Sequence, residues 1–210
     1  MELMRGVHVI ETNANCALLI DDRLILVDTG MYSNATEILS YLDRITYKPT
    51  DISSIVITHT HPDHVGGLAS LKQKSNAEVA AHRIEADYIS KKVKYPGPPG
   101  PQRHRACPVD VLLEDGDRYQ ELLVIHTPGH TPGNIALLDE ARSLLIAGDT
   151  VRNEGGGLGP MSDVYNIDPT EHRHSIKKVA AHDFERLIVG HGQPLAEDAS
   201  KSLKEAIARL

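Results

Sequence analysis

The run His59-Thr60-His61-Pro62-Asp63-His64 places three imidazoles and one carboxylate within six residues. Neutral imidazole is the commonest metal ligand in proteins, and carboxylate oxygens bind many of the same ions. The proline stops the preceding strand and forces a turn. The first two histidines can then face one ion together, whereas Asp63 and His64, on the far side of the turn, can hold a second one.

Three further candidate ligands follow apolar segments elsewhere in the chain, as His59 does. They are His130, Asp149 and His191, which come just after residues 122–127, 143–147 and 186–189. If these segments are strands that lie side by side and point the same way, their carboxyl ends share one edge of a sheet. Loops at such an edge carry functional residues on a rigid scaffold. We therefore expect the four groups to converge.

A two-metal centre uses all of these ligands. We expect a first ion on His59, His61 and His130, a second on Asp63, His64 and His191, and the two oxygens of Asp149 between the ions. Two divalent cations contribute about +4, two carboxylates −2 and a bridging hydroxide −1, which leaves about +1 at the reacting centre. Such a centre attracts a small anionic substrate or a polarised carbonyl, and Asp63 is the residue expected to orient the nucleophile.

The elements that position these residues are short apolar runs that alternate with longer amphipathic stretches, which is typical of a layered protein with both sheets and helices. Strands are expected at residues 17–20, 23–27, 54–58, 78–81, 109–113, 122–127, 134–138, 143–147 and 186–189. Helices are expected at residues 35–45, 65–74, 84–92, 169–181 and 197–210. Turn residues at 21–22 and 139–142 indicate two antiparallel hairpins.

Length and composition agree with a globular enzyme. The 210 residues suffice for a full hydrophobic core, and we expect one domain over residues 1–210. The net charge of −7 gives no footprint for nucleic acid. The amino end does not resemble a secretory signal, no apolar run is long enough to span a bilayer, and two cysteines are too few for a disulfide framework. These features predict a soluble cytoplasmic protein with no nucleic-acid or membrane partner.

Several motifs together resemble the metallo-β-lactamase fold superfamily, in the branch near the short glyoxalase II-like hydrolases. They cover nearly the whole chain and comprise residues 15–20, Val27-Asp28-Thr29-Gly30, residues 58–67, residues 127–133, Ala147-Gly148-Asp149-Thr150 and Gly190-His191-Gly192. The resemblance implies an α+β fold, a four-layer αββα sandwich with the metal pair at one edge. It also implies that Asp28 supports the ligands without being one of them.

Departures from the family pattern narrow the expected reaction. Asp149 stands where β-lactamases commonly have a cysteine ligand, so antibiotic hydrolysis is not expected. Only the expected helix at residues 197–210 follows the last ligand, so we do not expect the helical domain with which longer glyoxalase II enzymes grip glutathione. Quorum-signal lactonases place a tyrosine shortly after the bridging aspartate, where this chain has Val151, Arg152 and Asn153. The prediction is a metal-dependent hydrolase that cleaves a thioester, ester or lactone.

Other activities on the same fold stay open at this point. A persulfide dioxygenase would need only one iron, on His59, His130 and Asp149. A phosphodiesterase or nuclease is disfavoured by the acidic charge, and a non-catalytic metal-binding protein by the complete ligand set. Nitrogen and oxygen ligands suit zinc, the expected metal, and also iron or manganese.

Two predicted loops and several further histidines lie outside the predicted set of metal ligands. Residues 94–106 and 155–160 are expected to be loops, the first an excursion from the domain and the second a flap beside Asp149. Arg103-His104-Arg105 is either a clamp for a substrate anion or a solvated surface. His172 and His174 do not share a helix face, so only one of them can look toward the site. His8, His82, His126 and His182 are left out of the predicted site, because a structural role explains each of them equally well.

Overall fold

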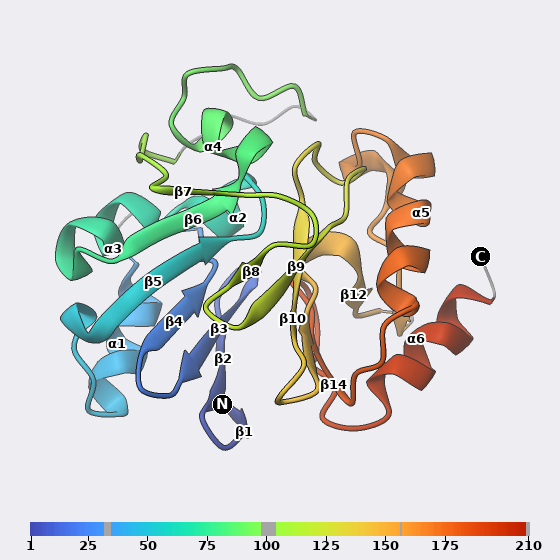
Figure 1. Cartoon of the computed structure of the whole chain (residues 1–210), viewed down its shortest axis with the longest axis horizontal. Helices are drawn as coiled ribbons and strands as arrows, with labels where there is room; N and C mark the ends of the chain where they lie inside the picture. Colours follow the sequence, from blue (N-terminus) through green and yellow to red (C-terminus); the bar gives the residue numbers. More distant parts are fainter. Residues whose placement is uncertain (32–34, 98–103, 156, 209–210) are drawn as a thin grey trace. The chain divides into compact units, whose positions relative to one another are not determined.

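The computed structural model describes residues 1–31, 35–97, 104–155 and 157–208 (Figure 1). The chain forms two compact units. The first is built from Met1–Tyr95 together with the described residues 104–112, and the second from Pro96, Gly97 and the described residues from Leu113 onward. The single domain expected over residues 1–210 stays a prediction. None of the helices in the described part of the chain is long and apolar enough to cross a membrane.

The first unit contains a seven-stranded sheet in the order β1-β2-β3-β4-β5-β6-β7. Its strands are β1 (Glu2–Met4), β2 (Val7–Glu11), β3 (Asn15–Ile20), β4 (Leu24–Val27), β5 (Ile52–Ile57), β6 (Glu78–His82) and β7 (Val111–Leu113). The strands from β1 to β4 pair antiparallel, which confirms the hairpin expected at residues 21–22, and β4, β5 and β6 pair parallel. The parallel strands direct the carboxyl end of β5, and His59 just beyond it, to one edge of the sheet.

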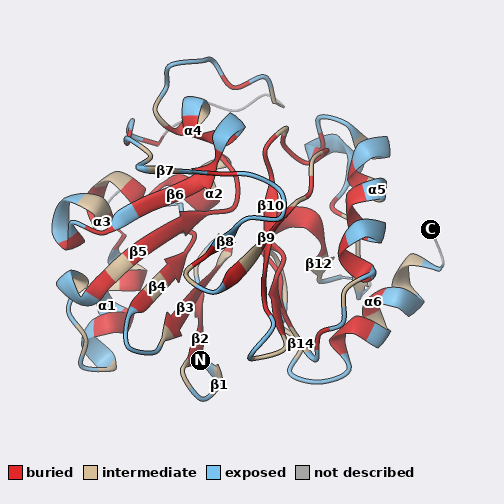
Figure 2. Ribbon diagram, in the orientation of Figure 1, coloured by how far each residue is buried: buried red, intermediate tan, exposed pale blue. Residues whose placement is uncertain are grey.

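Helices of the first unit pack their apolar faces against this sheet (Figures 1 and 2). They are α1 (Thr36–Arg44), α2 (Pro62–Val65), α3 (Leu68–Ser75) and α4 (Arg83–Ile89). In α1 the buried residues are Ile38, Tyr41 and Leu42, the spacing of a single apolar stripe. Leu68 and Leu71 of α3 join the same core as Ile55 and Ile57 of β5. This core fixes the two elements that flank the histidine run.

The second unit contains a five-stranded sheet in the order β14-β11-β10-β9-β8. Its strands are β8 (Arg118–Tyr119), β9 (Leu122–His126), β10 (Ile135–Asp139), β11 (Leu144–Ile146) and β14 (Arg186–Ile188). Strand β10 is antiparallel to both β9 and β11, and β11 is parallel to β14. Consequently β9, β11 and β14 all point the same way, which is the condition under which the residues that follow them lie at one edge of the sheet. The small hairpin of β12 (Arg152–Asn153) and β13 (Leu158–Gly159) follows β11.

Two helices cover the second sheet, α5 (Pro169–Ala180) and α6 (Ala199–Ile207) (Figure 1). Asp168 caps α5, because its Oδ1 atom accepts hydrogen bonds from the backbone N–H groups of Thr170 and Glu171 at 3.0 Å each. Pro169 occupies the first helical position, where its missing N–H costs nothing. The start of this helix is therefore where the sequence predicts it.

Three local expectations are wrong. The helix expected at 65–74 is two helices, because Pro62 begins α2 instead of only ending a strand. Strands β1 and β2 were not expected, since neither has a long apolar run of its own. Part of the second expected loop, Leu158–Gly159, is the strand β13.

Candidate metal centre

The histidine run connects β5 to α2 in the first unit, and its two halves hold separate groups of ligand atoms. His59 and His61 offer ring nitrogens within 4.8 Å of one another, and Asp63 and His64 offer a carboxylate oxygen and a ring nitrogen within the same limit. His59 and His64 are fully buried, whereas His61 and Asp63 are half-buried. The first unit thus brings together the ligands predicted from the run, in the predicted pairs.

A chain of hydrogen bonds orients two of these rings. The Oδ2 atom of Asp28 accepts from Nδ1 of His64 at 2.7 Å and from the hydroxyl of Thr58 at 2.7 Å. The Thr58 oxygen lies 3.1 Å from Nδ1 of His59 and can accept its proton. Both imidazoles therefore carry hydrogen on Nδ1, so a metal ion would be held through Nε2 of each. These contacts agree with the supporting role implied for Asp28.

Asp28 reaches this position because its own backbone is unusual. Its φ angle is 62°, in the left-handed region that aspartate and asparagine tolerate better than most residues. Its other oxygen, Oδ1, accepts from the backbone N–H of Thr58 at 2.8 Å. Three hydrogen bonds to one buried carboxylate therefore fix the end of β5 and the ring of His64, and Thr58 passes this on to the ring of His59.

Tyr95 contacts His61, the second histidine of the run. Its hydroxyl lies 2.8 Å from Nε2 of His61, and the two rings meet edge to face with centroids 5.6 Å apart. Tyr95 is buried, and burial together with the nearby Glu85 carboxylate raises the pKa of the phenol, which therefore stays protonated at neutral pH. No signal in the sequence marked this residue, because it lies in a segment interpreted only as a loop.

Glu85 anchors the turn itself. Its fully buried carboxylate accepts hydrogen bonds from both the backbone N–H and the hydroxyl of Thr60, the residue between the first two ligands. A buried carboxylate with two donors from one residue fixes that residue's backbone. Glu85 was missed because it belongs to the first turn of a helix, where acidic residues are common for another reason.

In the second unit, the topology brings the other three predicted ligands to one edge of the sheet. His130 follows β9, Asp149 follows β11 and His191 follows β14, and these three strands point the same way. The Oδ2 atom of Asp149 lies 3.2 Å from Nε2 of His130 and 3.4 Å from Nε2 of His191. One carboxylate oxygen thus lies near both histidines, so Asp149 could contribute to the binding of an ion at either of them.

A glycine makes room for this carboxylate. A Cβ atom on Gly190 would lie 2.0 Å from Oδ1 of Asp149 and 3.0 Å from the carbonyl oxygen of Gly148. Such distances are far inside van der Waals contact, so no side chain fits at residue 190 while Asp149 keeps its place. The motif residues Gly190 and Gly148 therefore shape the site.

A second hydrogen-bond network orients His130. Asn166, which is buried, places Oδ1 2.9 Å from Nδ1 of His130, and its Nδ2 donates to the Met161 carbonyl at 3.3 Å. The Met161 N–H in turn donates to Nε2 of His172 at 3.3 Å. His130 is thereby left to bind an ion through Nε2. Neither Asn166 nor Met161 was expected from the sequence.

His172 and His174 lie on different faces of α5, as expected. His172 is fully buried, with its ring centroid 6.1 Å from that of His130, whereas His174 is exposed. Burial, reinforced by the neighbouring His130, lowers the pKa of His172 to about 4. His172 is therefore neutral at physiological pH and adds no positive charge beside His130.

The donor set fits metal ions. Each unit contributes nitrogen and carboxylate oxygen donors, which suit zinc, iron or manganese. In four of the five histidines predicted as ligands, one ring nitrogen lies within hydrogen-bond distance of an oxygen atom, which leaves the other nitrogen for an ion. Such hydrogen bonds orient metal-bound imidazoles in proteins.

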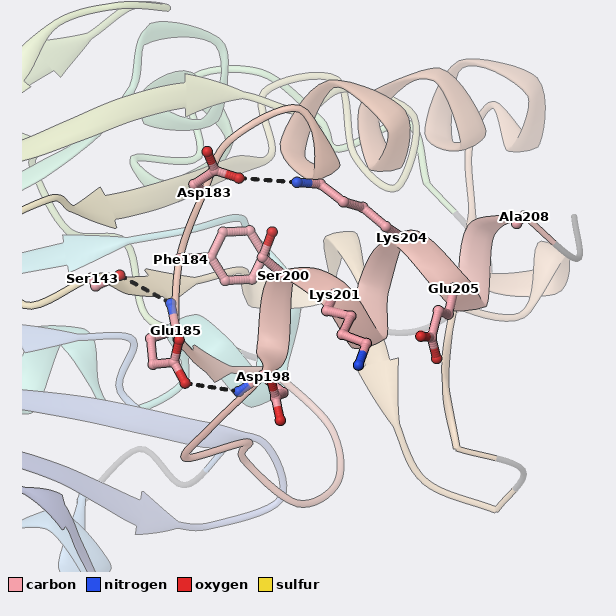
Figure 3. A pocket seen from close by; sticks show the side chains of 10 residues that line it. All are labelled: Ser143, Asp183, Phe184, Glu185, Asp198, Ser200, Lys201, Lys204, Glu205 and Ala208. Atoms are coloured by element: carbon pink, nitrogen blue, oxygen red, sulfur yellow. Dashed lines mark hydrogen bonds and ion pairs between the residues drawn. The ribbon is translucent and has the colours of Figure 1, made fainter.

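A surface hollow of about 630 Å³ in the second unit has none of the predicted ligands in its lining (Figure 3). Ser143 and Glu185, which line it, precede β11 and β14, so the hollow is at the opposite edge of the sheet from Asp149 and His191. Some of its polar groups pair with one another, for example Lys204 with Asp183 at 3.0 Å.

The loop predictions have mixed outcomes. Arg103 and Gly156 lie outside the described residues, so the proposed clamp and flap are not tested there. His104 is buried with Nε2 3.3 Å from the carbonyl oxygen of Ile89, which contradicts a role in an exposed clamp. Arg105 is exposed. Cys16 and Cys107 are both free thiols inside the first unit.

Comparison of the sequence with known families gives a match to the metallo-beta-lactamase superfamily over residues 9–191, which includes every predicted ligand. The chain is 30% identical to "Probable metallo-hydrolase YflN" of Bacillus subtilis, over 89% of this chain and 82% of that protein. It is 33% identical to a hydroxyacylglutathione hydrolase of Pseudomonas aeruginosa over 62% of this chain, but it spans only 43% of that enzyme.

Solved structures agree on the fold. A metallo-beta-lactamase of Cronobacter sakazakii superposes with a TM-score of 0.80, at 22% identity, over 100% of this chain and 90% of that one. A subclass B3 metallo-beta-lactamase of Bradyrhizobium japonicum gives 0.78, at 22% identity, over 100% and 89%. These similarities confirm the predicted α+β metallo-β-lactamase fold. With the ligand motifs in both units and a family match over most of its length, the chain is a hydrolase that belongs to the metallo-β-lactamase superfamily.

Proposed function

We propose that the protein uses a dinuclear metal centre to hydrolyse a thioester, ester or lactone in a small-molecule substrate. The proposed ligands are those predicted from the sequence: His59, His61 and His130 for one ion, Asp63, His64 and His191 for the other, and Asp149 for both. Zinc is the proposed metal. The free buried cysteines and acidic charge favour a cytoplasmic enzyme without a nucleic-acid partner.

The position of Asp149 is the observation that carries this proposal. Its Oδ2 atom lies 3.2 Å from Nε2 of His130 and 3.4 Å from Nε2 of His191, and these two histidines are assigned to different ions. A carboxylate oxygen shared by the ligands of two ions supports a bridged pair over a single ion. Asp149 is also almost fully buried, where a carboxylate is stable only with cationic or donor partners.

A pair of divalent ions supplies a hydroxide nucleophile at neutral pH and electrophilic assistance at the carbonyl and leaving group. The residues of this chain position and tune that chemistry. Asp63, half-buried beside His64, can accept a proton from the attacking water and orient it. The bonds from Asp28 and Asn166 keep the imidazoles in the tautomer that leaves Nε2 for an ion.

Two similarities favour thioesters and related acyl compounds as substrates. One relative is named as a hydroxyacylglutathione hydrolase, an enzyme that acts on a thioester, and another as a metallo-hydrolase. The match spans less than half of the former, so we do not extend its glutathione specificity to this chain.

Metal content and a substrate panel test the proposal together. Protein purified without added metal is analysed for zinc, iron and manganese, and then assayed with thioesters, lactones and phosphodiesters in the presence of each metal. Two ions per chain and acyl hydrolysis are the expected results. One iron with oxygen consumption, or activity confined to phosphodiesters, would overturn it.

Asp149→Ala provides the sharpest variant. It should remove an ion and lower kcat by several orders of magnitude. A control variant should lose an aspartate that has no partner, so Asp139→Ala is unsuitable because Asp139 pairs with Arg142. Asp22→Ala is a better control, since Asp22 is exposed on the turn between β3 and β4. Full activity of Asp149→Ala with one ion retained would exclude a dinuclear mechanism.

A further inference from the structure

We propose that Tyr95 is a positioning residue for the metal centre, which holds Nε2 of His61 so that this histidine binds its ion through Nδ1. The inference rests on the proposed function, because it assigns a role toward the ion that the centre would hold. It concerns residues of the first unit only. It also gives a function to Tyr95, which lies in a stretch that the sequence marks as a loop.

The contact is specific. The Tyr95 hydroxyl oxygen lies 2.8 Å from Nε2 of His61, and the tyrosine is buried although it lies in a segment without regular secondary structure. The rings of His61 and Tyr95 meet edge to face at 82°. Tyr88 of α4 packs against the other side of this arrangement, with its ring centroid 5.5 Å from that of Tyr95 and an interplanar angle of 87°. Three aromatic rings in series thus hold the hydroxyl in place.

The hydrogen-bond chemistry determines which nitrogen can bind an ion. A neutral imidazole carries one proton, and the nitrogen that donates a lone pair to a metal cannot carry it. With its hydroxyl oxygen as the acceptor, Tyr95 favours the tautomer that has its proton on Nε2, which leaves Nδ1 of His61 for the ion. His59 and His64 show the opposite arrangement, because their Nδ1 atoms are the ones that face Thr58 and Asp28.

Glu85 and Tyr95, at the two ends of the segment 85–95, therefore hold the first half of the histidine run in place. Glu85, at the start of α4, binds the backbone N–H and hydroxyl of Thr60, and Tyr95, six residues after the end of α4, binds the ring of His61. Backbone and side chain are thus fixed separately. Removal of the Tyr95 hydroxyl should release the ring of His61 without disturbing the turn.

Tyr95→Phe tests this role, with Tyr88→Phe as the matched control. Each change deletes one hydroxyl from the same aromatic stack, but only the first deletes the contact with His61. Metal-free protein is titrated with zinc in competition with a chromophoric chelator. Tyr95→Phe should weaken one of the two zinc sites about 10- to 100-fold and leave the other near its wild-type affinity. At saturating zinc its kcat should return to near the wild-type value.

A spectroscopic measurement provides a readout that a merely structural role would not change. Long-range ¹H–¹⁵N NMR spectra identify which ring nitrogen of each histidine carries a proton. In wild type and Tyr88→Phe, His61 should show a protonated Nε2 that exchanges slowly with water. In Tyr95→Phe this proton should exchange faster, or the tautomers should mix.

The two proposals fail in different ways. If wild type binds two zinc ions and Tyr95→Phe matches Tyr88→Phe in both affinities, the inference is wrong and the metal centre stands. If wild type binds none of zinc, iron and manganese, the metal centre is wrong, and with it the role of Tyr95 toward an ion. NMR of the metal-free protein then still tests the contact itself, because identical His61 tautomers in wild type and Tyr95→Phe would show that Tyr95 does not set the tautomer.

Discussion

Oδ2 of Asp28 lies 2.7 Å from Nδ1 of His64, and the same oxygen accepts a hydrogen bond from the hydroxyl of Thr58, which stands next to His59. A single buried carboxylate oxygen thereby controls the tautomers of two predicted metal ligands. Its negative charge also strengthens the electron donation of both imidazoles toward an ion. Replacement of Asp28 should therefore weaken metal binding, although Asp28 is not itself a predicted ligand.

Replacement of Asp28 by asparagine tests this control. Asparagine keeps the size of the side chain and tolerates the left-handed backbone, so the fold should persist. Whichever way the amide is turned, however, its NH₂ group meets a donor, either the Thr58 N–H or the pair formed by the Thr58 hydroxyl and His64 Nδ1. We expect zinc affinity to fall about 10- to 100-fold in chelator competition. Asp22→Asn, on an exposed turn, should leave it unchanged.

Gly190→Ala separates the shape of the site from its donor chemistry. The added Cβ would lie 2.0 Å from Oδ1 of Asp149, so the carboxylate must move although no ligand has been changed. We expect loss of metal and activity approaching that of Asp149→Ala, with a stability cost of about 1–3 kcal/mol from overpacking. Gly159→Ala is the control, because a Cβ there meets nothing within 4 Å. Retention of both ions at wild-type affinity by Gly190→Ala would contradict this account of the site.

The ligands could be predicted from the sequence because they are chemically distinctive and follow recognisable strands. His130, Asp149 and His191 each come two or three residues after a segment whose apolar character marks it as a strand, and the actual strands differ by at most one residue at each end. These three residues then lie at one edge of the sheet if the strands before them point the same way. The topology of the second sheet fulfils that condition through one antiparallel strand, β10, placed between β9 and β11.

The residues that orient the ligands could not be predicted in the same way. Tyr95, Glu85 and Asn166 are ordinary residue types, and each lies at least 20 residues from the group it contacts. Their roles depend on how a loop or helix packs over the ligands, which no local pattern encodes. Asp28 was the exception, because a family motif rather than its own surroundings pointed to it.

Thr60→Val measures the contribution of the Glu85 anchor to stability. Valine keeps the shape and the β-branched character of threonine but removes the hydroxyl that donates to the buried Glu85 carboxylate. The backbone N–H of residue 60 still donates, at 2.8 Å in the present structure. Loss of a hydrogen bond to a buried charged group should lower the free energy of unfolding by about 1–3 kcal/mol, measured by urea denaturation. Thr170→Val, at an exposed position of α5, should change it by less than about 0.5 kcal/mol.

The low pKa of His172 predicts a specific dependence of stability on pH. Burial and the neighbouring His130 lower this pKa from 6.5 to about 4. Because the unfolded chain then binds a proton more readily than the folded one, the contribution of neutral His172 to stability is complete above pH 6.5. It is lost progressively as the pH falls from 6.5 toward 4. Between pH 7.5 and pH 5 this loss amounts to about 2 kcal/mol, as an upper limit.

His172→Phe isolates that effect in metal-free protein, where release of a bound ion cannot contribute. Phenylalanine keeps a buried ring but has no titrating group, so the variant should be less stable at pH 7.5, where it lacks the acceptor for the Met161 N–H. The difference from wild type should then shrink by up to about 2 kcal/mol when urea denaturation is repeated at pH 5. His174→Phe, on the exposed face of the same helix, should show no comparable narrowing. Parallel declines of wild type and His172→Phe between the two pH values would mean that His172 takes up a proton equally in the folded and unfolded states.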